Sequence, residues 1–432
     1  MRLASLCSVL LVAACGGSSP ATADGPAADT AEPGPGGAVR VTVTQAGVPV
    51  GGLSVYFLDP NNTVVAMTTT DATGRASATL HAGGSVTVVH APLASGTEVR
   101  DLESWVGVQP GDDLALELPS FHAAMNLMVS VPVASLPDVA SYNVVSPCGG
   151  TGLFLAGQTI QLSLLPNCVV DPLRSDFIAF AQDASGQAIA AFVALQVGIS
   201  SGQHLALTGA YQPVADIPIA YANIGPTQSI ELGAFAITGA GPLQVANPYL
   251  SATGGSIAGT FHWPAQLTTG TRVLEAGLLS PDSPQRVTSW APVASSVSVD
   301  LMDQVGQPIT SQATIDPSHR QLAWTLADHG APAHLAVASL TVDQGASKSL
   351  VWTIVAPGAA PQIALPQLPG SIIQFPSPGT TGVGLTLLRV PGGTASWTRV
   401  LGTGGYYAGF AGLFSASPSG SMTQVFPPVV PL

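Results

Sequence analysis

The stretch Val39-Arg40-Val41-Thr42-Val43-Thr44 alternates apolar and polar side chains, and it decides the fold class. Successive side chains of a β-strand point to opposite faces, so this alternation predicts a strand with one buried face. A turn, Gly47-Val48-Pro49-Val50-Gly51-Gly52, leads to a second apolar run from Leu53 to Leu58. Three further runs repeat the order of strand and turn, at 64–70, 76–80 and 85–90. Short strands at this spacing predict a β-sandwich.

The composition extends this prediction to the whole chain. Of the 432 residues, 48 are Gly and 37 are Pro, and these residues interrupt helices and favour turns. Hydrophobic residues make up 46% and charged residues 8%, which indicates a globular protein with a large buried area. The net charge is −13, and the few basic residues are scattered. A nucleic-acid partner is therefore not expected, because no basic cluster is present to neutralise phosphates.

The N-terminus has the features of an export signal. Arg2 precedes a short apolar run that ends at Ala14, and small residues follow it. This order is typical of a secretory signal peptide, and the run is shorter than the roughly 18 residues that a membrane-spanning helix needs. The ending Val12-Ala13-Ala14-Cys15 resembles the lipobox of bacterial lipoproteins. The resemblance implies removal of residues 1–14 and a lipid on Cys15; the alternative is an ordinary signal cleaved near Ala14, which leaves a free thiol.

The segment after the cysteine is small and polar. Residues 16–38 hold Ala, Gly, Pro, Ser, Thr and a few acids, with almost no large apolar side chain. Such a segment cannot bury a core, so residues 15–38 are predicted to be a disordered linker that reaches roughly 25–30 Å from the anchor. Gly16 stands where an Asp signals inner-membrane retention in lipoproteins. The resemblance therefore implies the outer membrane of a Gram-negative bacterium.

The cysteines indicate an oxidising compartment. Of the 4 cysteines, Cys7 lies in the signal and Cys15 is the lipid site, which leaves Cys148 and Cys168. In an exported protein such a pair predicts a disulfide. Closing a loop of about 20 residues contributes about 3 kcal/mol in the chain-entropy description. A reactive or metal-binding thiol pair is the alternative, but no His or acidic partner lies near it in the sequence.

Turn chemistry provides a second resemblance. The order of strand, Gly47-Val48-Pro49-Val50, strand and Asp71-Ala72-Thr73-Gly74-Arg75 is similar to that of transthyretin-like (carboxypeptidase regulatory-like) modules and of bacterial Ig-like repeats. The resemblance covers about 37–92 and implies a scaffold module without catalytic residues. Val106–Leu116 also matches Val197–Leu207, 91 positions later. Unless this short match is due to chance, it indicates two related modules, 39–119 and 120–212.

The remaining residues, 213–432, are predicted to form a C-terminal β-rich domain or two modules that divide near 295. Leu322-Ala323-Trp324-Thr325-Leu326 and Leu350-Val351-Trp352-Thr353-Ile354 place each tryptophan on the same strand face as its apolar neighbours. Trp324 and Trp352 are therefore expected in a core. The predicted fold is all-β: tandem β-sandwich modules followed by a C-terminal β-rich domain.

Known catalytic patterns are missing from the sequence. The metalloprotease pattern His-Glu-x-x-His does not occur, and the nearest approach to a nucleophile elbow, Gly254–Ala258, lacks its final Gly. Asp316 and His319 flank Pro317-Ser318 and are interpreted as a turn. Among the other histidines, His90 has no acid at a suggestive offset. No catalytic residue and no cofactor are predicted.

One group of acids has the residue types that calcium binds. Asp112-Asp113 lies in the Pro110-Gly111 turn, and Asp101 and Glu103 are expected in an exposed loop just before it. Calcium sites in sandwich loops use such acids. The second copy, however, has Gln203-His204 in place of the two aspartates, and the Asp-x-Asp-x-Asp spacing is missing. A solvated turn is the favoured interpretation, and no metal is predicted.

Four aromatic residues are candidates for contact with a ligand or partner. Trp263 and Trp290 stand near prolines at predicted strand ends, and Tyr406-Tyr407 lies in a Gly-rich stretch. We expect a non-enzymatic cell-envelope lipoprotein with a structural or adhesion-like role. Its expected partners are the membrane, through the lipid on Cys15, and envelope polymers or surface proteins. The alternative is a secreted hydrolase or carbohydrate-binding protein with a site in the C-terminal β domain.

Overall fold

The computed structural model describes residues 36–389 and 420–425, with gaps at 46, 91–97, 119–124, 148–153, 156, 165–172, 239–240, 246–250, 268–270, 280–284, 293–295, 301–308, 312, 317, 327, 329–331, 346–347, 359 and 374–379. For part of the strand residues it describes the backbone alone. The described residues form strands and turns and contain no helix, so the prediction of an all-β protein is confirmed. Within them, no helix is long and apolar enough to span a membrane.

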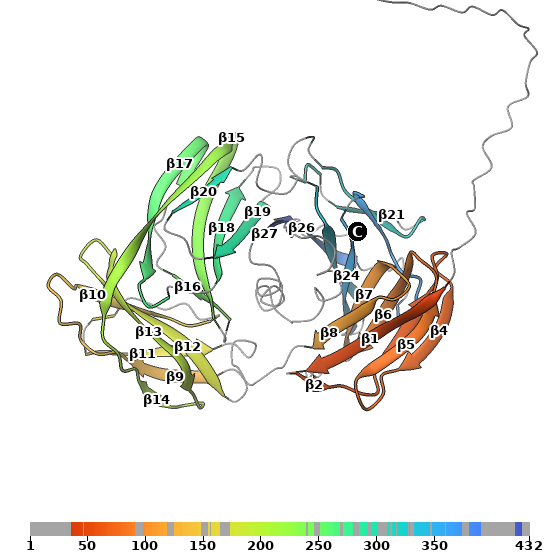
Figure 1. Ribbon diagram of the computed structural model, residues 1–432, viewed down its shortest axis with the longest axis horizontal. Coiled ribbons are helices and arrows are strands. Elements are labelled where there is room, and N and C mark those ends of the chain that lie inside the picture. Colours follow the sequence, from red (N-terminus) through yellow and green to blue (C-terminus); the bar gives the residue numbers. More distant parts are fainter. Residues whose placement is uncertain are drawn as a thin grey trace, which may run out of the picture. The chain divides into compact units, whose positions relative to one another are not determined.

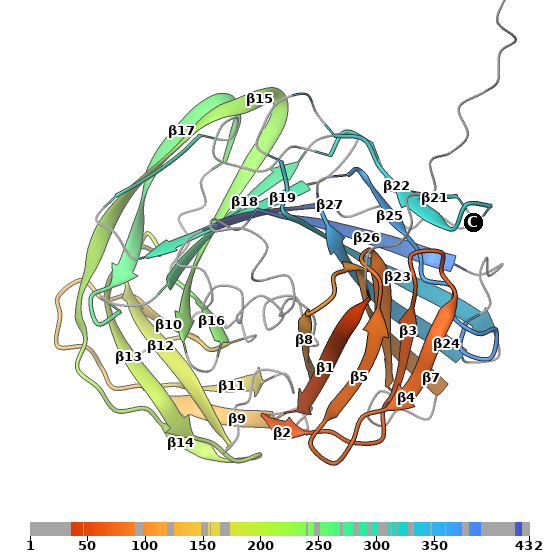
Figure 2. The same ribbon diagram turned by 45° about the vertical axis from the view of Figure 1, so that its right-hand side comes forward.

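The strands are numbered β1 to β27 in chain order, and Figures 1 and 2 together label them. The first eight are β1 (Gly37–Gln45), β2 (Val48–Pro49), β3 (Ser54–Leu58), β4 (Val64–Thr69), β5 (Arg75–Leu80), β6 (Gly84–His90), β7 (Glu98–Val108) and β8 (Asp113–Leu118). The next six are β9 (Met125–Ser130), β10 (Ser141–Val145), β11 (Thr159–Leu164), β12 (Arg174–Gln182), β13 (Ala188–Gly198) and β14 (His204–Ala206).

The later strands vary more in length, from 3 residues in β21 to 27 in β15. They are β15 (Gln212–Thr238), β16 (Gly241–Gln244), β17 (Ser251–Pro264), β18 (Thr271–Leu279), β19 (Gln285–Pro292) and β20 (Val297–Asp300). The last are β21 (Thr314–Asp316), β22 (Gln321–Ala323), β23 (Leu335–Gly345), β24 (Lys348–Pro357), β25 (Gln362–Ala364), β26 (Thr380–Arg389) and β27 (Gly420–Val425).

The first eight strands form a sandwich of two sheets. In one sheet β1 pairs antiparallel with β2 and β5 and parallel with β8; in the other, β3 pairs with β4 and β6, and β6 pairs with β7 (Figure 2). Val39, Val41 and Val43 of β1 are fully buried, which confirms the predicted inward face of that strand. They pack in one cluster with Phe57 of β3 and Trp105 of β7. Strand β1 begins at Gly37, two residues before the predicted start.

Strands β9 to β14 repeat this arrangement. β9 pairs antiparallel with β11 and parallel with β14, as β1 does with β5 and β8. β12 pairs with β10 and β13, as β6 does with β3 and β7. The matched stretches lie at equivalent places: Gly111 N donates to Ala38 O at 3.0 Å, and Gly202 N donates to Asn126 O at 2.8 Å. The sequence match therefore reflects one strand topology used twice.

Two aspartate turns also share their hydrogen bonds. Asp71 Oδ1 and Asp183 Oδ1 each accept from a backbone N–H two residues on, from that residue's hydroxyl, and from a backbone N–H four residues on. The donors are Thr73 and Arg75 in the first turn and Ser185 and Gln187 in the second. These bonds lower the pKa of both carboxyls, and the bond from the hydroxyl has the largest effect. The turns join β4 to β5 and β12 to β13, so their positions in the two sandwiches differ.

Backbone pairing crosses the predicted boundary between 39–119 and 213–432. Residues Glu98–Trp105 of β7 pair in parallel with Lys348–Val355 of β24, and we call this contact the seam. Beyond it, β24 pairs with β23, β23 with β26, β26 with β27, β27 with β19, β19 with β18, and β18 with β15. One hydrogen-bonded path thus runs from the N-terminal sandwich into the C-terminal strands.

The two faces of the sheet at the seam are both covered by apolar side chains. Val355 of β24 packs with the N-terminal cluster that contains Trp105. Trp352 and Trp324 pack in a second cluster on the other face, with Leu322 of β22 and Ile363 of β25. Trp352 is 0% and Trp324 4% exposed, so the prediction that both belong to a core is confirmed.

Candidate functional site

The aromatic residues predicted to contact a ligand differ in what the structure describes of them: one is fully described, one by its backbone alone, and two lie outside the described residues. Trp263 is 2% exposed, and its Nε1 donates to the carbonyl of Leu267 at 2.7 Å. The expectation of an exposed Trp263 is wrong, because the chain turns after β17 and the indole packs in a core cluster. Trp290 lies on β19, where the backbone alone is described. Tyr406, Tyr407 and the predicted modification and disulfide sites Cys15, Cys148 and Cys168 lie outside the described residues.

The acids of the Pro110-Gly111 turn have protein partners. Asp112 Oδ2 accepts from the backbone N–H of Gln109 at 2.7 Å. Asp113 Oδ1 lies 3.5 Å from Arg40 Nη1, and both side chains are largely exposed. These contacts fit the predicted solvated turn. Among the described residues, no group of three metal-binding side chains comes together.

Asp101 and Glu103 do not lie in an exposed loop, which corrects the sequence-based expectation. They belong to β7, which begins at Glu98. Asp101 is directly opposite His90 of β6, and Glu103 is opposite Val88. On the other side of β7, Thr353 of β24 stands opposite Glu103. We call His90, Asp101 and Glu103 the acid–histidine cluster.

The cluster is held away from water. The His90 side chain is 6% exposed and the Glu103 side chain 16%, and His90 Nε2 lies 3.9 Å from Glu103 Oε1. That distance allows an ion pair when the imidazole is protonated, but it is too long for a hydrogen bond. Neither His90 Nε2 nor Glu103 Oε2 has a hydrogen-bond partner among the described residues. Buried polar atoms without partners are rare and costly.

Burial dominates the electrostatics of both carboxyls. It raises the pKa of Glu103, an effect that the nearby His90 opposes and the like charge of Asp101 reinforces. Thr353 lowers the pKa of Glu103 slightly. Burial also raises the pKa of Asp101, again opposed by His90. A protonated Glu103 is therefore better suited to this site than a carboxylate.

A hydrogen-bonded triad occupies the opposite face of the same strands. Trp352 Nε1 of β24 donates to Ser104 Oγ of β7 at 2.8 Å. Ser104 Oγ lies 2.7 Å from Thr87 Oγ1 of β6, and all three residues are 0% exposed. These bonds connect β6, β7 and β24 through side chains as well as through the backbone. The seam thus carries polar contacts on both faces.

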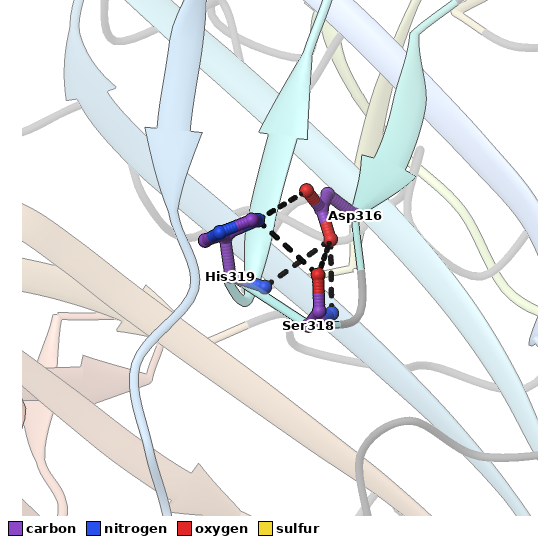
Figure 3. A network of polar contacts seen from close by, with 3 residues as sticks. All are labelled: Asp316, Ser318 and His319. Atoms are coloured by element: carbon purple, nitrogen blue, oxygen red, sulfur yellow. Dashed lines mark hydrogen bonds and ion pairs between the residues drawn. The ribbon is translucent and has the colours of Figure 1, made fainter.

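The exposed group Asp316, Ser318 and His319 has the residue types of a catalytic triad but not its geometry (Figure 3). In a triad the serine and the carboxylate contact different ring nitrogens of the histidine. Here Asp316 Oδ2 lies 2.5 Å and Ser318 Oγ 3.2 Å from the same atom, His319 Nδ1. Ser318 Oγ also donates to Asp316 Oδ1 at 2.5 Å. The bonds from Ser318 and then His319 lower the pKa of Asp316, and the group acts as a turn.

A further histidine–acid pair lies across two strands. His262 Nδ1 of β17 is 2.8 Å from Asp216 Oδ1 of β15, and the two residues are directly opposite in the strand register. Asp216 is 69% exposed. The pair contributes a cross-strand contact on a solvent-facing surface, where such pairs are worth a few tenths of a kcal/mol to about 1 kcal/mol.

Comparison with known proteins finds no matching family model and no matching curated protein. Among solved structures, the Bacillus anthracis TIE protein matches 61% of this chain and 50% of its own, at 11% identity and a TM-score of 0.17. This chain thus spans about half the length of that protein. A streptococcal ancillary pilin matches 62% of this chain and 98% of its own, at 9% identity and a TM-score of 0.17.

A tetra-tandem repeat from the extending region of a large adhesion protein matches 82% of this chain and 95% of its own. The identity is 15% and the TM-score 0.13. The second of these neighbours is a pilin and the third belongs to an adhesion protein. TM-scores this low do not establish a common arrangement of the whole chain.

Proposed function

We propose that this chain is a non-enzymatic, exported lipoprotein that displays a β-sandwich body at the cell surface in a structural or adhesion-like role. The observation that supports the proposal most strongly is the seam, where β7 pairs with a strand about 250 positions further along the chain. Pairing of this kind joins the N-terminal sandwich to the C-terminal strands through backbone hydrogen bonds. Sandwiches that shared only flexible linkers would move independently.

The described polar groups support a scaffold. Three histidine–acid contacts among the described residues lie in a buried strand pair, an exposed turn and a partly exposed strand pair. The turn and the partly exposed strand pair stabilise local structure in their observed geometry. The two sandwiches with one strand topology add to this, since repeated β modules commonly serve as spacers.

The anchor and the boundaries complete the proposal. Residues 1–14 are the signal, Cys15 carries the lipid, and 15–38 form the linker. The modules span 39–119, 120–212 and 213–432, and Cys148 and Cys168 form a disulfide. Trp290, Tyr406 and Tyr407 are the proposed contacts with envelope polymers or surface proteins.

The test is metabolic labelling with a fatty-acid analogue in a Gram-negative host. We expect the full chain to be labelled and membrane-bound, because two or more acyl chains anchor a protein firmly. Cys15→Ala should lose the label and appear in the soluble fraction. Cys7→Ala is the matched control and should be labelled normally. An unlabelled native chain, or an equally labelled Cys15→Ala variant, would contradict the lipoprotein assignment.

A further inference from the structure

Two members of the acid–histidine cluster, Asp101 and Glu103, lie in the seam, and the cluster contains buried polar atoms without hydrogen-bond partners among the described residues. Glu103 is one of the β7 residues that pair with β24, opposite Thr353. We propose that His90, Asp101 and Glu103 form a proton-controlled latch: the seam is closed when Glu103 is protonated, and it loosens as Glu103 loses its proton.

The position of Glu103 gives the latch its mechanism. Its side chain is mostly buried in the closed seam, and its Oε2 has no hydrogen-bond partner among the described residues. A carboxylate oxygen at such a place has lost hydration without gaining a hydrogen bond in return. Separation of β24 from β7 would expose one side of Glu103 to water and relieve that cost. Deprotonation therefore favours the open seam.

The surroundings provide little other compensation. The charged groups that act on Glu103 are His90 of β6 and Asp101 of its own strand. The neutral Thr353 on β24 also lowers the pKa of Glu103. The facing sheet buries apolar side chains in the cluster with Trp105: Val39, Val41, Val43, Leu114, Leu116 and Leu118. His90 is thus the one basic residue among these neighbours of Glu103.

The sign of the pH effect follows from the direction of the shift. The pKa of Glu103 is higher in the folded chain than in an unfolded one, since burial raises it. The folded state therefore binds the proton more tightly, and the stabilisation is complete below the ordinary carboxyl pKa of about 4.3. It is lost as pH rises through the higher pKa of the folded state.

Hydrogen exchange of the full chain measures the latch directly. After correction for the intrinsic pH dependence of exchange, protection of peptides covering 98–105 and 348–355 should fall about tenfold between about pH 4.5 and about pH 8. Peptides covering β9 and β11 provide the internal reference. The Glu103→Gln side chain is isosteric with the protonated acid and does not titrate. In this variant the protection of the seam peptides should change by no more than about twofold over the same pH range.

Asp113→Asn is the matched control, because it removes an exposed carboxylate from β8, the next strand along the chain. This variant should retain the tenfold fall in protection of the seam peptides with rising pH. Two results would overturn the latch. One is seam protection in the native chain that does not change with pH. The other is a Glu103→Gln variant that retains the full change. The first result is decisive even if Glu103→Gln fails to fold.

Discussion

Replacing Asp176 by alanine is expected to destabilise the folded chain by about 3 kcal/mol, because the change removes a buried carboxylate from a strand irregularity. Asp176 lies on β12 and is 1% exposed. Its Oδ1 accepts from the backbone N–H of Gln196 on β13 at 2.6 Å and lies 3.4 Å from Nε2 of the same residue. Gln196 has φ = 55°, in the left-handed region that non-glycine residues rarely occupy.

The register of the two strands explains why one carboxylate matters so much. Ser175 pairs with Val197 and Phe177 with Ala194, so β13 has an extra residue opposite Asp176. Asp176 thus holds the bulge at Gln196 in place. Asp176→Asn retains an acceptor oxygen, and we expect it to keep about half of the lost stability. Urea unfolding followed by hydrogen exchange of β12 and β13 gives the measurement; a change below about 0.5 kcal/mol for Asp176→Ala would contradict this role.

Replacing Trp352 by alanine is expected to cost about 4 kcal/mol and to open the seam. The indole is 0% exposed and packs with Leu102, Leu340 and Ile354. Its Nε1 also donates to Ser104 on the neighbouring strand. Truncation therefore removes apolar contact on the face opposite the acid–histidine cluster, together with the hydrogen bond between β24 and β7.

The hydrogen bond can be separated from the apolar contact by comparing two phenylalanine variants. Trp352→Phe keeps most of the buried area and loses the bond, so a cost of about 1–2 kcal/mol is expected. Trp324 is buried in the same cluster, but its Nε1 has no partner among the described residues, which makes Trp324→Phe the matched control. In thermal and urea unfolding, the free energy of unfolding of Trp352→Phe should be lower than that of Trp324→Phe. Equal stabilities would show that the bond to Ser104 contributes nothing.

Local patterns predict most of the strands in the N-terminal half. The alternation at Val39–Thr44 becomes β1, and the turn residues around Asp71 and Gly74 take the expected roles: Gly74 has φ = 73° and its carbonyl accepts from Val43 N at 2.8 Å. These features depend on neighbours in sequence. The buried tryptophans follow from the same logic, because apolar residues two positions apart share a strand face.

The seam and the acid–histidine cluster depend on register, which local patterns do not contain. His90 and Asp101 are 11 positions apart in the sequence, and only the pairing of β6 with β7 places them opposite one another. Thr353 reaches Glu103 through a strand pairing between distant parts of the chain. The stretch Asp101-Leu102-Glu103-Ser104 has three polar residues out of four, a composition typical of an exposed loop. The sequence therefore does not predict that Glu103 is buried. A position next to Pro264, at the end of a strand, favours an exposed Trp263. The turn that follows the strand instead covers the indole, whose Nε1 donates to the carbonyl of Leu267.

Cysteine cross-linking across the seam tests the central claim most directly, namely that the N-terminal sandwich and the C-terminal strands share one sheet. Asp101 and Val351 are directly opposite in the parallel pair. Neighbouring strands are about 4.8 Å apart, which lies within the range that a disulfide bridges. In the Asp101→Cys, Val351→Cys double variant, mild oxidation should therefore link the peptides that contain 101 and 351, as detected by mass spectrometry without reduction.

The control pair is Asp101→Cys with Thr341→Cys, because Thr341 lies opposite Val351 on β23, one strand further away. The separation of about 10 Å across two strand spacings is too large for a disulfide. The account predicts efficient linkage of 101 to 351 and little linkage of 101 to 341. Absence of the 101–351 linkage in the folded chain, or equal linkage in both pairs, would show that β7 and β24 are not paired.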